Sequence, residues 1–151
     1  MKKRGFGFKD AFRGIFHAML CERNFRVHIV AVLTVVYFGT VFKITRTAWA
    51  ILVVVMGLVM AAELVNTAIE AIVDKVSPEK CKLARIAKDC ASGAVLTLAI
   101  SAVVVAGFIF SDADGWVRIW EYIKGNYIYL AVFALLSVIF VFARTKDKEL
   151  D

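Results

Sequence analysis

The sequence lacks the signatures of the common nucleotide-binding and hydrolytic sites. It has no G-x-x-x-x-G-K-Ser/Thr phosphate loop, and GFG at residues 5–7 is too short for a G-x-G-x-x-G turn. It has no H-E-x-x-H motif, and His17 and His28 are eleven positions apart. It also has no internal repeat and no low-complexity linker. Chemistry on a nucleotide would therefore need a different kind of site.

Charge and proline are scarce as well. Charged residues make up 21% of the 151 positions, hydrophobic residues 61%, and the mean hydropathy is +0.75. This balance is typical of an integral membrane protein and not of a soluble domain. The single proline, Pro78, predicts that a long helix ends shortly before it, at about Val73.

Four uncharged runs approach the ~20 residues that a helix needs to cross the bilayer core. They lack the alternation of barrel strands, and only helices or closed barrels satisfy their backbone in lipid. Residues 6–20 add an amphipathic surface helix with Phe8, Phe12 and Phe16 on its apolar stripe. The predicted fold class is all-α, an integral membrane helical bundle with this N-terminal surface helix and four transmembrane helices. The runs are residues 27–42, 47–62, 90–111 and 125–143.

The distribution of lysine and arginine predicts the orientation. Fifteen of them lie before the first run, between the second and third, and after the fourth, against four in the other two loops. Because cytoplasmic segments carry the excess, both termini are expected in the cytoplasm and the first span is expected to be retained. The three cysteines fall on that reducing side, so no disulfide is expected. The net charge of +6 fits an anionic lipid surface and needs no nucleic acid.

The segment ELVNTAIEAIVD, residues 63–74, places polar groups at the end of the second run. On a helix, Glu63, Asn66, Glu70 and Asp74 share one face. At 1.5 Å per residue from the outer surface, Glu63 lies about 24 Å deep and Glu70 about 34 Å, against a core of ~30 Å. Two alternatives stay open, a solvated helix end for Glu70 and Asp74, and interhelical hydrogen bonding for Glu63 and Asn66.

The same boundary receives Glu22, just before the first run, and Lys88 with Asp89, just before the third. Glu22 has the alternative of pairing with Arg26 four residues on, and Lys88 with Asp89 that of an ordinary span flank. Their common depth favours a functional site instead. Carboxylates at a wet edge suit Mg²⁺ and substrate phosphates, and the deeper Glu63 suits acceptance of a proton from a lipid hydroxyl. Because lysine neutralises phosphate charge, the arrangement implies phosphoryl transfer at the interface.

Three motifs carry a family resemblance: ELVNTAIEAIVD at 63–74, AKD at 87–89 followed by SGAVL, and ERNFRVH at 22–28. With them, residues 5–110 resemble the small prokaryotic membrane lipid kinases, diacylglycerol kinase and undecaprenol kinase. ERNFRVH is more similar to the undecaprenol kinase branch. Residues 111–151 depart from the family pattern and are expected to form an extracytoplasmic loop, a fourth transmembrane helix used for packing, and a short cytoplasmic tail.

The resemblance implies a role for each candidate residue. Glu63 would be the catalytic base, and Glu22 and Glu70 would hold Mg²⁺ on the phosphates of ATP. It also implies a homotrimer in the bacterial inner or plasma membrane, with residues 1–110 as the kinase domain. The residues implied to bind nucleotide are Lys3, Asn66, Asp74, Glu79, Lys80, Lys88 and Asp89.

The resulting hypothesis is ATP-dependent phosphorylation of a membrane lipid alcohol by direct in-line transfer of the γ-phosphoryl group. Undecaprenol is the favoured substrate, and diacylglycerol is the alternative. A transporter or proton relay, or a structural scaffold, is the alternative of a different class, because Glu63 and Asn66 would also suit a polar pathway. Against a relay, the third and fourth runs carry no ionisable residue.

Overall fold

The structure is a computed structural model, and it describes residues 7–77 and 81–143. Within these ranges all regular structure is helical, which confirms the predicted fold class. Four of the helices are long and apolar enough to cross a membrane. The helices are α1 (Phe8–Cys21), α2 (Arg23–Phe42), α3 (Arg46–Val76), α4 (Lys82–Ile109) and α5 (Ala113–Phe142).

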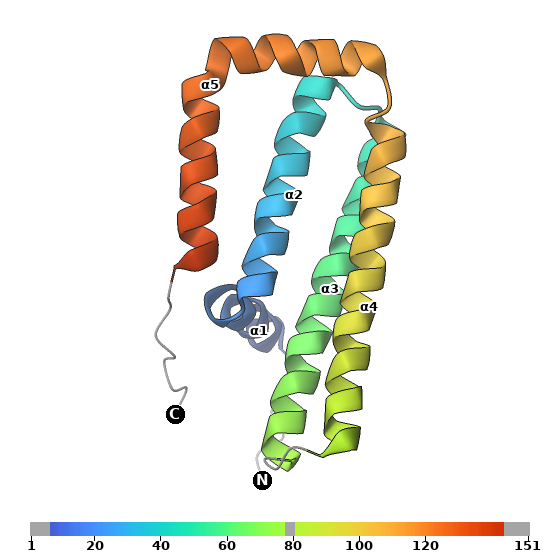
Figure 1. The fold of residues 1–151 in the computed structure, drawn as a ribbon, viewed down its shortest axis with the longest axis vertical. Helices are drawn as coiled ribbons and strands as arrows, with labels where there is room; N and C mark the ends of the chain where they lie inside the picture. The colour runs from blue at the N-terminus through green and yellow to red at the C-terminus, as the bar shows by residue number, and fades with distance from the viewer. Residues whose placement is uncertain (1–6, 78–80, 144–151) are drawn as a thin grey trace.

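The long helices form two neighbouring pairs (Figure 1). α3 and α4 run antiparallel beside each other, and α2 packs on α3 and on α5. α1 lies across the lower end of the bundle, where it contacts α2 and α3. α3, the helix that was predicted to end at about Val73, continues to Val76. The polar face of α3 is therefore held between neighbours at the end of the bundle that carries α1.

Local sequence explains the helix boundaries. Lys43 ends α2 in the left-handed conformation with φ 61°, which permits the tight turn into α3. The Thr45 hydroxyl then accepts a hydrogen bond from the Ala48 backbone N–H at 3.2 Å and caps α3. Asp112 caps α5 in the same way by accepting from the Gly115 backbone N–H at 2.9 Å.

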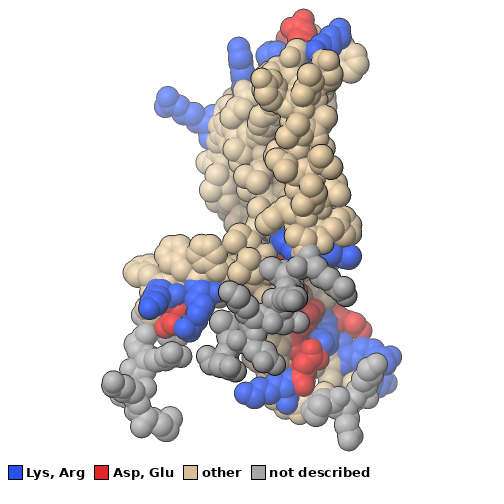
Figure 2. Space-filling model, turned by 90° about the vertical axis from the view of Figure 1, so that its left-hand side faces the viewer, with Lys and Arg blue, Asp and Glu red and all other residues tan. Residues whose placement is uncertain are grey.

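Charge is confined to the two ends of the molecule (Figure 2). An uncharged band lies between them, as expected of a surface in contact with lipid. The charged side chains of α1 lie on its lower side, away from this band, and its phenylalanines are exposed. The charged residues of this helix are Lys9, Asp10 and Arg13, and Arg13 pairs with Asp10 at 2.9 Å. This geometry is that of a helix lying in the membrane interface, as predicted.

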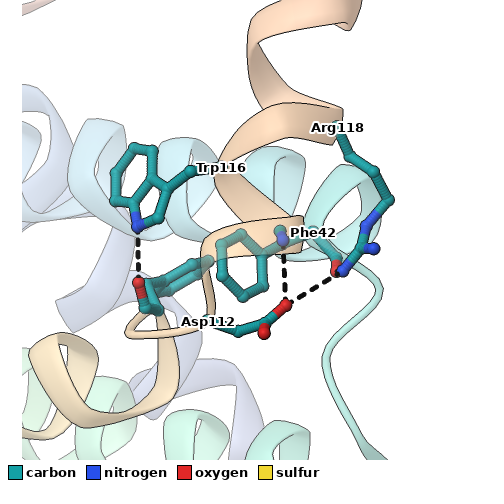
Figure 3. A network of polar contacts seen from close by, with 6 residues as sticks. Phe42, Asp112, Trp116 and Arg118 are labelled. Atoms are coloured by element: carbon teal, nitrogen blue, oxygen red, sulfur yellow. Dashed lines mark hydrogen bonds and ion pairs between the residues drawn. The ribbon is translucent and has the colours of Figure 1, made fainter.

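The segment expected as an outer loop is helical instead. α5 starts at Ala113 and runs across the end of the bundle opposite α1 before it bends at Asn126, whose φ of −130° and ψ of 18° are not helical (Figure 1). The Asp112 cap starts this helix, and Trp116 anchors it by donating from its indole N–H to the Phe110 backbone oxygen at 2.7 Å (Figure 3). Gly115 faces the Phe42 ring so closely that no side chain fits between them.

Candidate active site

Glu63 lies on the inner face of α3 and is 3% exposed. Asn66, one turn further on, is 6% exposed. The negative charges of Glu22 and Glu70 both act on the Glu63 carboxyl group. Glu22 reaches this position because it is the single residue that joins α1 to α2. The charges of two carboxylates from different parts of the chain therefore act on one buried position.

A hydrogen-bond chain connects this face of α3 to α4. The Asn66 amide N–H donates to the Glu70 carboxylate at 3.1 Å, and the Ser92 hydroxyl donates to the Asn66 amide oxygen at 3.4 Å. The Thr67 hydroxyl donates to the backbone oxygen of Glu63 at 3.1 Å. Asn66 thus orients Glu70 while Ser92 fixes the amide. Asn66 and Glu70 are thus held by hydrogen bonds, whereas the Asp74 side chain, one turn further on, is exposed.

One turn beyond, α3 and α4 form an ion pair. The Lys88 ammonium donates to the Asp74 carboxylate at 2.7 Å. Both residues line a cavity of about 370 Å³ with Asp89 and Arg85. The lysine side chain is 34% exposed, so its charge is accessible from the cavity. The cavity brings cations and carboxylates together at the end of the bundle where α1 lies.

Cys81 closes the same cavity at the start of α4. Its thiol accepts a hydrogen bond from the Ser77 hydroxyl at 3.5 Å and another from the Ala84 backbone N–H at 3.3 Å. Both bonds lower the pKa of the Cys81 thiol because they stabilise its thiolate form, and the bond from Ser77 has the larger effect. Cys81 is exposed, so the thiol is open to reagents in water.

Several residues of this region were not among the predicted site residues. Ser92 lies in the SGAVL motif, and its hydrogen bond to Asn66 depends on the register of α4. Arg85 has a sequence signal, because it precedes Lys88 by three positions and so shares its helix face. The sequence around Cys81 contains no motif that indicates a functional role, and shows only that Cys81 precedes a helix. Lys3, Glu79 and Lys80 lie outside the described residues.

The donor set fits magnesium. Mg²⁺ prefers oxygen ligands and is usually held by one or two carboxylates together with substrate phosphates and water. Glu22 and Glu70 offer two carboxylates whose charges act on Glu63. Within residues 7–77 and 81–143, no three histidine, cysteine, aspartate or glutamate side chains are grouped to hold a metal ion by themselves. The residues present suit a metal that is shared with phosphate oxygens.

Comparison with known proteins gives a consistent match. Residues 9–110 match the family described as prokaryotic diacylglycerol kinase. A diacylglycerol kinase from Synechocystis sp. is 43% identical over 101 residues, which cover 66% of this chain and 58% of that protein's length. The undecaprenol kinase of Bacillus subtilis is 36% identical over 103 residues, covering 68% of this chain and 84% of that kinase. The diacylglycerol kinase of Escherichia coli K12 is 36% identical over 94 residues.

Proposed function

This chain belongs to the prokaryotic diacylglycerol kinase family, and we propose that it transfers the γ-phosphoryl group of ATP to the hydroxyl of a membrane lipid. The observation that carries the proposal is the buried Glu63, within the membrane-spanning helix α3, with the charges of Glu22 and Glu70 acting on it. A carboxylate at this place has no evident structural purpose. None of the hydrogen bonds and ion pairs among the described residues involves its side chain.

In the proposed reaction Glu63 is the general base. Its carboxylate takes the proton of the lipid hydroxyl as the oxygen forms a bond to the γ-phosphorus. The bond from that phosphorus to the β–γ bridging oxygen breaks, and ADP leaves. No covalent enzyme intermediate is needed, because acceptor and donor meet in one site. Asn66 and Ser92 support this step by keeping the carboxylate neighbour Glu70 in one orientation.

The phosphates of ATP are proposed to lie between the carboxylates and the cavity of α3 and α4. Mg²⁺, held by Glu22 and Glu70, would neutralise phosphate charge when bound. Lys88 adds a positive charge from α4, and Asp74 fixes its ammonium at 2.7 Å. We assign Asp89 to the same nucleotide environment, since it lines the cavity. Lys3, Glu79 and Lys80 remain predicted contacts to nucleotide.

Undecaprenol is the proposed lipid substrate, because ERNFRVH at residues 22–28 resembles the undecaprenol kinase branch. Diacylglycerol is the second candidate, and the 43% identity to the Synechocystis diacylglycerol kinase supports it. Both lipids place a primary hydroxyl below the headgroups, within the depth expected for Glu63. We further propose a homotrimer in the bacterial plasma membrane with both termini in the cytoplasm, residues 1–110 as the kinase domain, and 111–151 as an added packing element.

The test is a phosphoryl-transfer assay with the full chain in detergent micelles. Radiolabelled ATP and Mg²⁺ are supplied with undecaprenol in one reaction and diacylglycerol in another. We expect label in the undecaprenol fraction, less or none in the diacylglycerol fraction, and none in either when Mg²⁺ is chelated. Labelling of neither lipid would refute the kinase proposal and favour a transporter or scaffold. Preferential labelling of diacylglycerol would leave the kinase and change the substrate.

A further inference from the structure

Arg26 is a buried cation at the edge of the candidate site. It lies one helical turn after Glu22 on α2 and is 7% exposed. Few arginines are buried without an acidic partner, because a desolvated charge is costly. Among the described residues, no ion pair involves Arg26. Its side chain must therefore be stabilised in some other way.

The partner of Arg26 is the end of α5. One terminal nitrogen of its guanidinium donates to the backbone oxygen of Ala143, the residue that follows the last turn of α5. The last carbonyls of a helix lack intrahelical donors and carry partial negative charge. The Ala143 carbonyl directly follows them, so a guanidinium bonded to it lies at this partly negative end of α5 and gains a favourable charge interaction. Its Nε atom stays buried without a partner among the described residues.

This contact excludes the local alternative. A side chain four residues after a glutamate on a helix is within reach of it, and Glu22 and Arg26 have that spacing. The structure joins them only through the backbone, where the Arg26 N–H donates to the Glu22 carbonyl at 3.3 Å. The Arg26 side chain turns to α5 instead. The Glu22 carboxylate is left without an ion pair among the described residues.

We propose that the end of α5 holds the Arg26 guanidinium away from Glu22, so that Glu22 stays available to the metal. The inference rests on the proposed function, in which Glu22 holds Mg²⁺. It deepens that function because α5 lies outside residues 9–110, the part that matches the family. The added helix α5 thus influences the site through its contact with Arg26.

The docking of α5 on α2 offers a place to perturb this contact from a distance. Phe133 of α5 stacks on Tyr37 of α2 with ring centroids 6.1 Å apart, and it lines a groove between the two helices with Leu130. Replacing both by alanine loosens α5 within the apolar layer without touching the site. Leu135 and Leu136, which are 60% and 58% exposed on the same helix, give the matched control pair L135A/L136A.

The experiment is a mutant cycle of L130A/F133A with R26M in the full chain. The first readout is the affinity for Mn²⁺, followed by electron paramagnetic resonance in the presence of a non-hydrolysable ATP analogue. We expect L130A/F133A to bind Mn²⁺ about fivefold more weakly, because the released arginine pairs with Glu22; this corresponds to about 1 kcal/mol. R26M alone and the control pair should bind like the parent chain. Adding R26M to L130A/F133A should restore the affinity.

The second readout is the apparent KM for Mg²⁺ in the lipid kinase assay, which should rise in L130A/F133A while kcat at saturating Mg²⁺ stays within about twofold. Failure of R26M to restore Mn²⁺ affinity, or an unchanged affinity in L130A/F133A, would overturn the inference and leave the kinase proposal standing. Restored Mn²⁺ affinity without phosphorylation of any lipid would refute the kinase proposal instead. Loss of Mn²⁺ binding in R26M alone would make Arg26 a direct part of the site.

Discussion

Replacement of Glu63 by glutamine separates the catalytic reading of the site from a structural one. Glutamine has nearly the same shape, so the 3% exposed position is filled as before. The change removes a carboxylate that lacks any hydrogen bond or ion pair among the described residues and that the charges of Glu22 and Glu70 act on. The structure therefore predicts opposite effects on stability and on turnover.

The magnitudes follow from burial and from the role of a base. An ionisable side chain in the bilayer core costs ~2.5–3.5 kcal/mol on insertion scales, and part of this cost falls on Glu63 near the edge of that layer. We expect the free energy of unfolding of E63Q to equal that of the parent chain or to exceed it by up to about 1 kcal/mol. Loss of a general base lowers turnover by about 10²- to 10⁴-fold.

The assay combines thermal unfolding in detergent, followed by circular dichroism, with the rate of lipid phosphorylation. E121Q is the matched control, because Glu121 is an exposed carboxylate at the opposite end of the bundle and should leave both quantities unchanged. If E63Q kept turnover within about tenfold of the parent chain, Glu63 would not be the base. If it lost stability together with activity, the carboxylate would be a structural hydrogen-bonding group and the reasoning from burial would be wrong.

Three further predictions concern the cavity and the outer corner. D74N should lower the free energy of unfolding by less than about 1 kcal/mol, because its ion pair with Lys88 is partly exposed, yet raise the ATP KM several-fold; steady-state kinetics with an unchanged ATP KM would contradict it. Because hydrogen bonds lower the pKa of Cys81, its thiolate forms at lower pH than that of a free thiol. The rate of Cys81 alkylation, measured by peptide mass spectrometry, should therefore reach half its maximum at a lower pH than the rate for a model thiol. G115A should destabilise the bundle by about 1–3 kcal/mol in thermal unfolding through overlap with an aromatic ring, whereas G107A, with open space around it, should not.

The sequence predicts the span helices well because long uncharged runs leave few alternatives in lipid. The sequence also predicts that Glu63 and Asn66 share one helix face, and both are buried in the structure. Burial is expected because polar side chains in a membrane-spanning helix face the interior of the bundle. Lys88 and Asp74, both named as candidate residues from the sequence, form an ion pair in the structure. The metal, nucleotide and base roles of these residues remain predictions that the mutants above test.

Two features were beyond sequence patterns. The helix that begins at Ala113 was expected as a loop because its first residues are polar, whereas the Asp112 cap and the packing of Gly115 on Phe42 decide its start. The sequence also did not predict the partner of Arg26. Local spacing favoured Glu22, and only the tertiary placement of the end of α5 makes the Ala143 carbonyl available. Local rules fail where a distant segment offers a better partner.

The two ends of α5 are attached to α2 by the same physical device. At the outer end, the Arg118 guanidinium of α5 donates to the Phe42 carbonyl, the last residue of α2, at 3.0 Å (Figure 3). At the inner end, Arg26 of α2 donates to Ala143 after the last turn of α5. Each arginine meets the carbonyl end of the opposite helix, where charge and unpaired acceptors favour it. The apolar middle then needs no strong polar contact, and one of the two attachments necessarily falls beside Glu22.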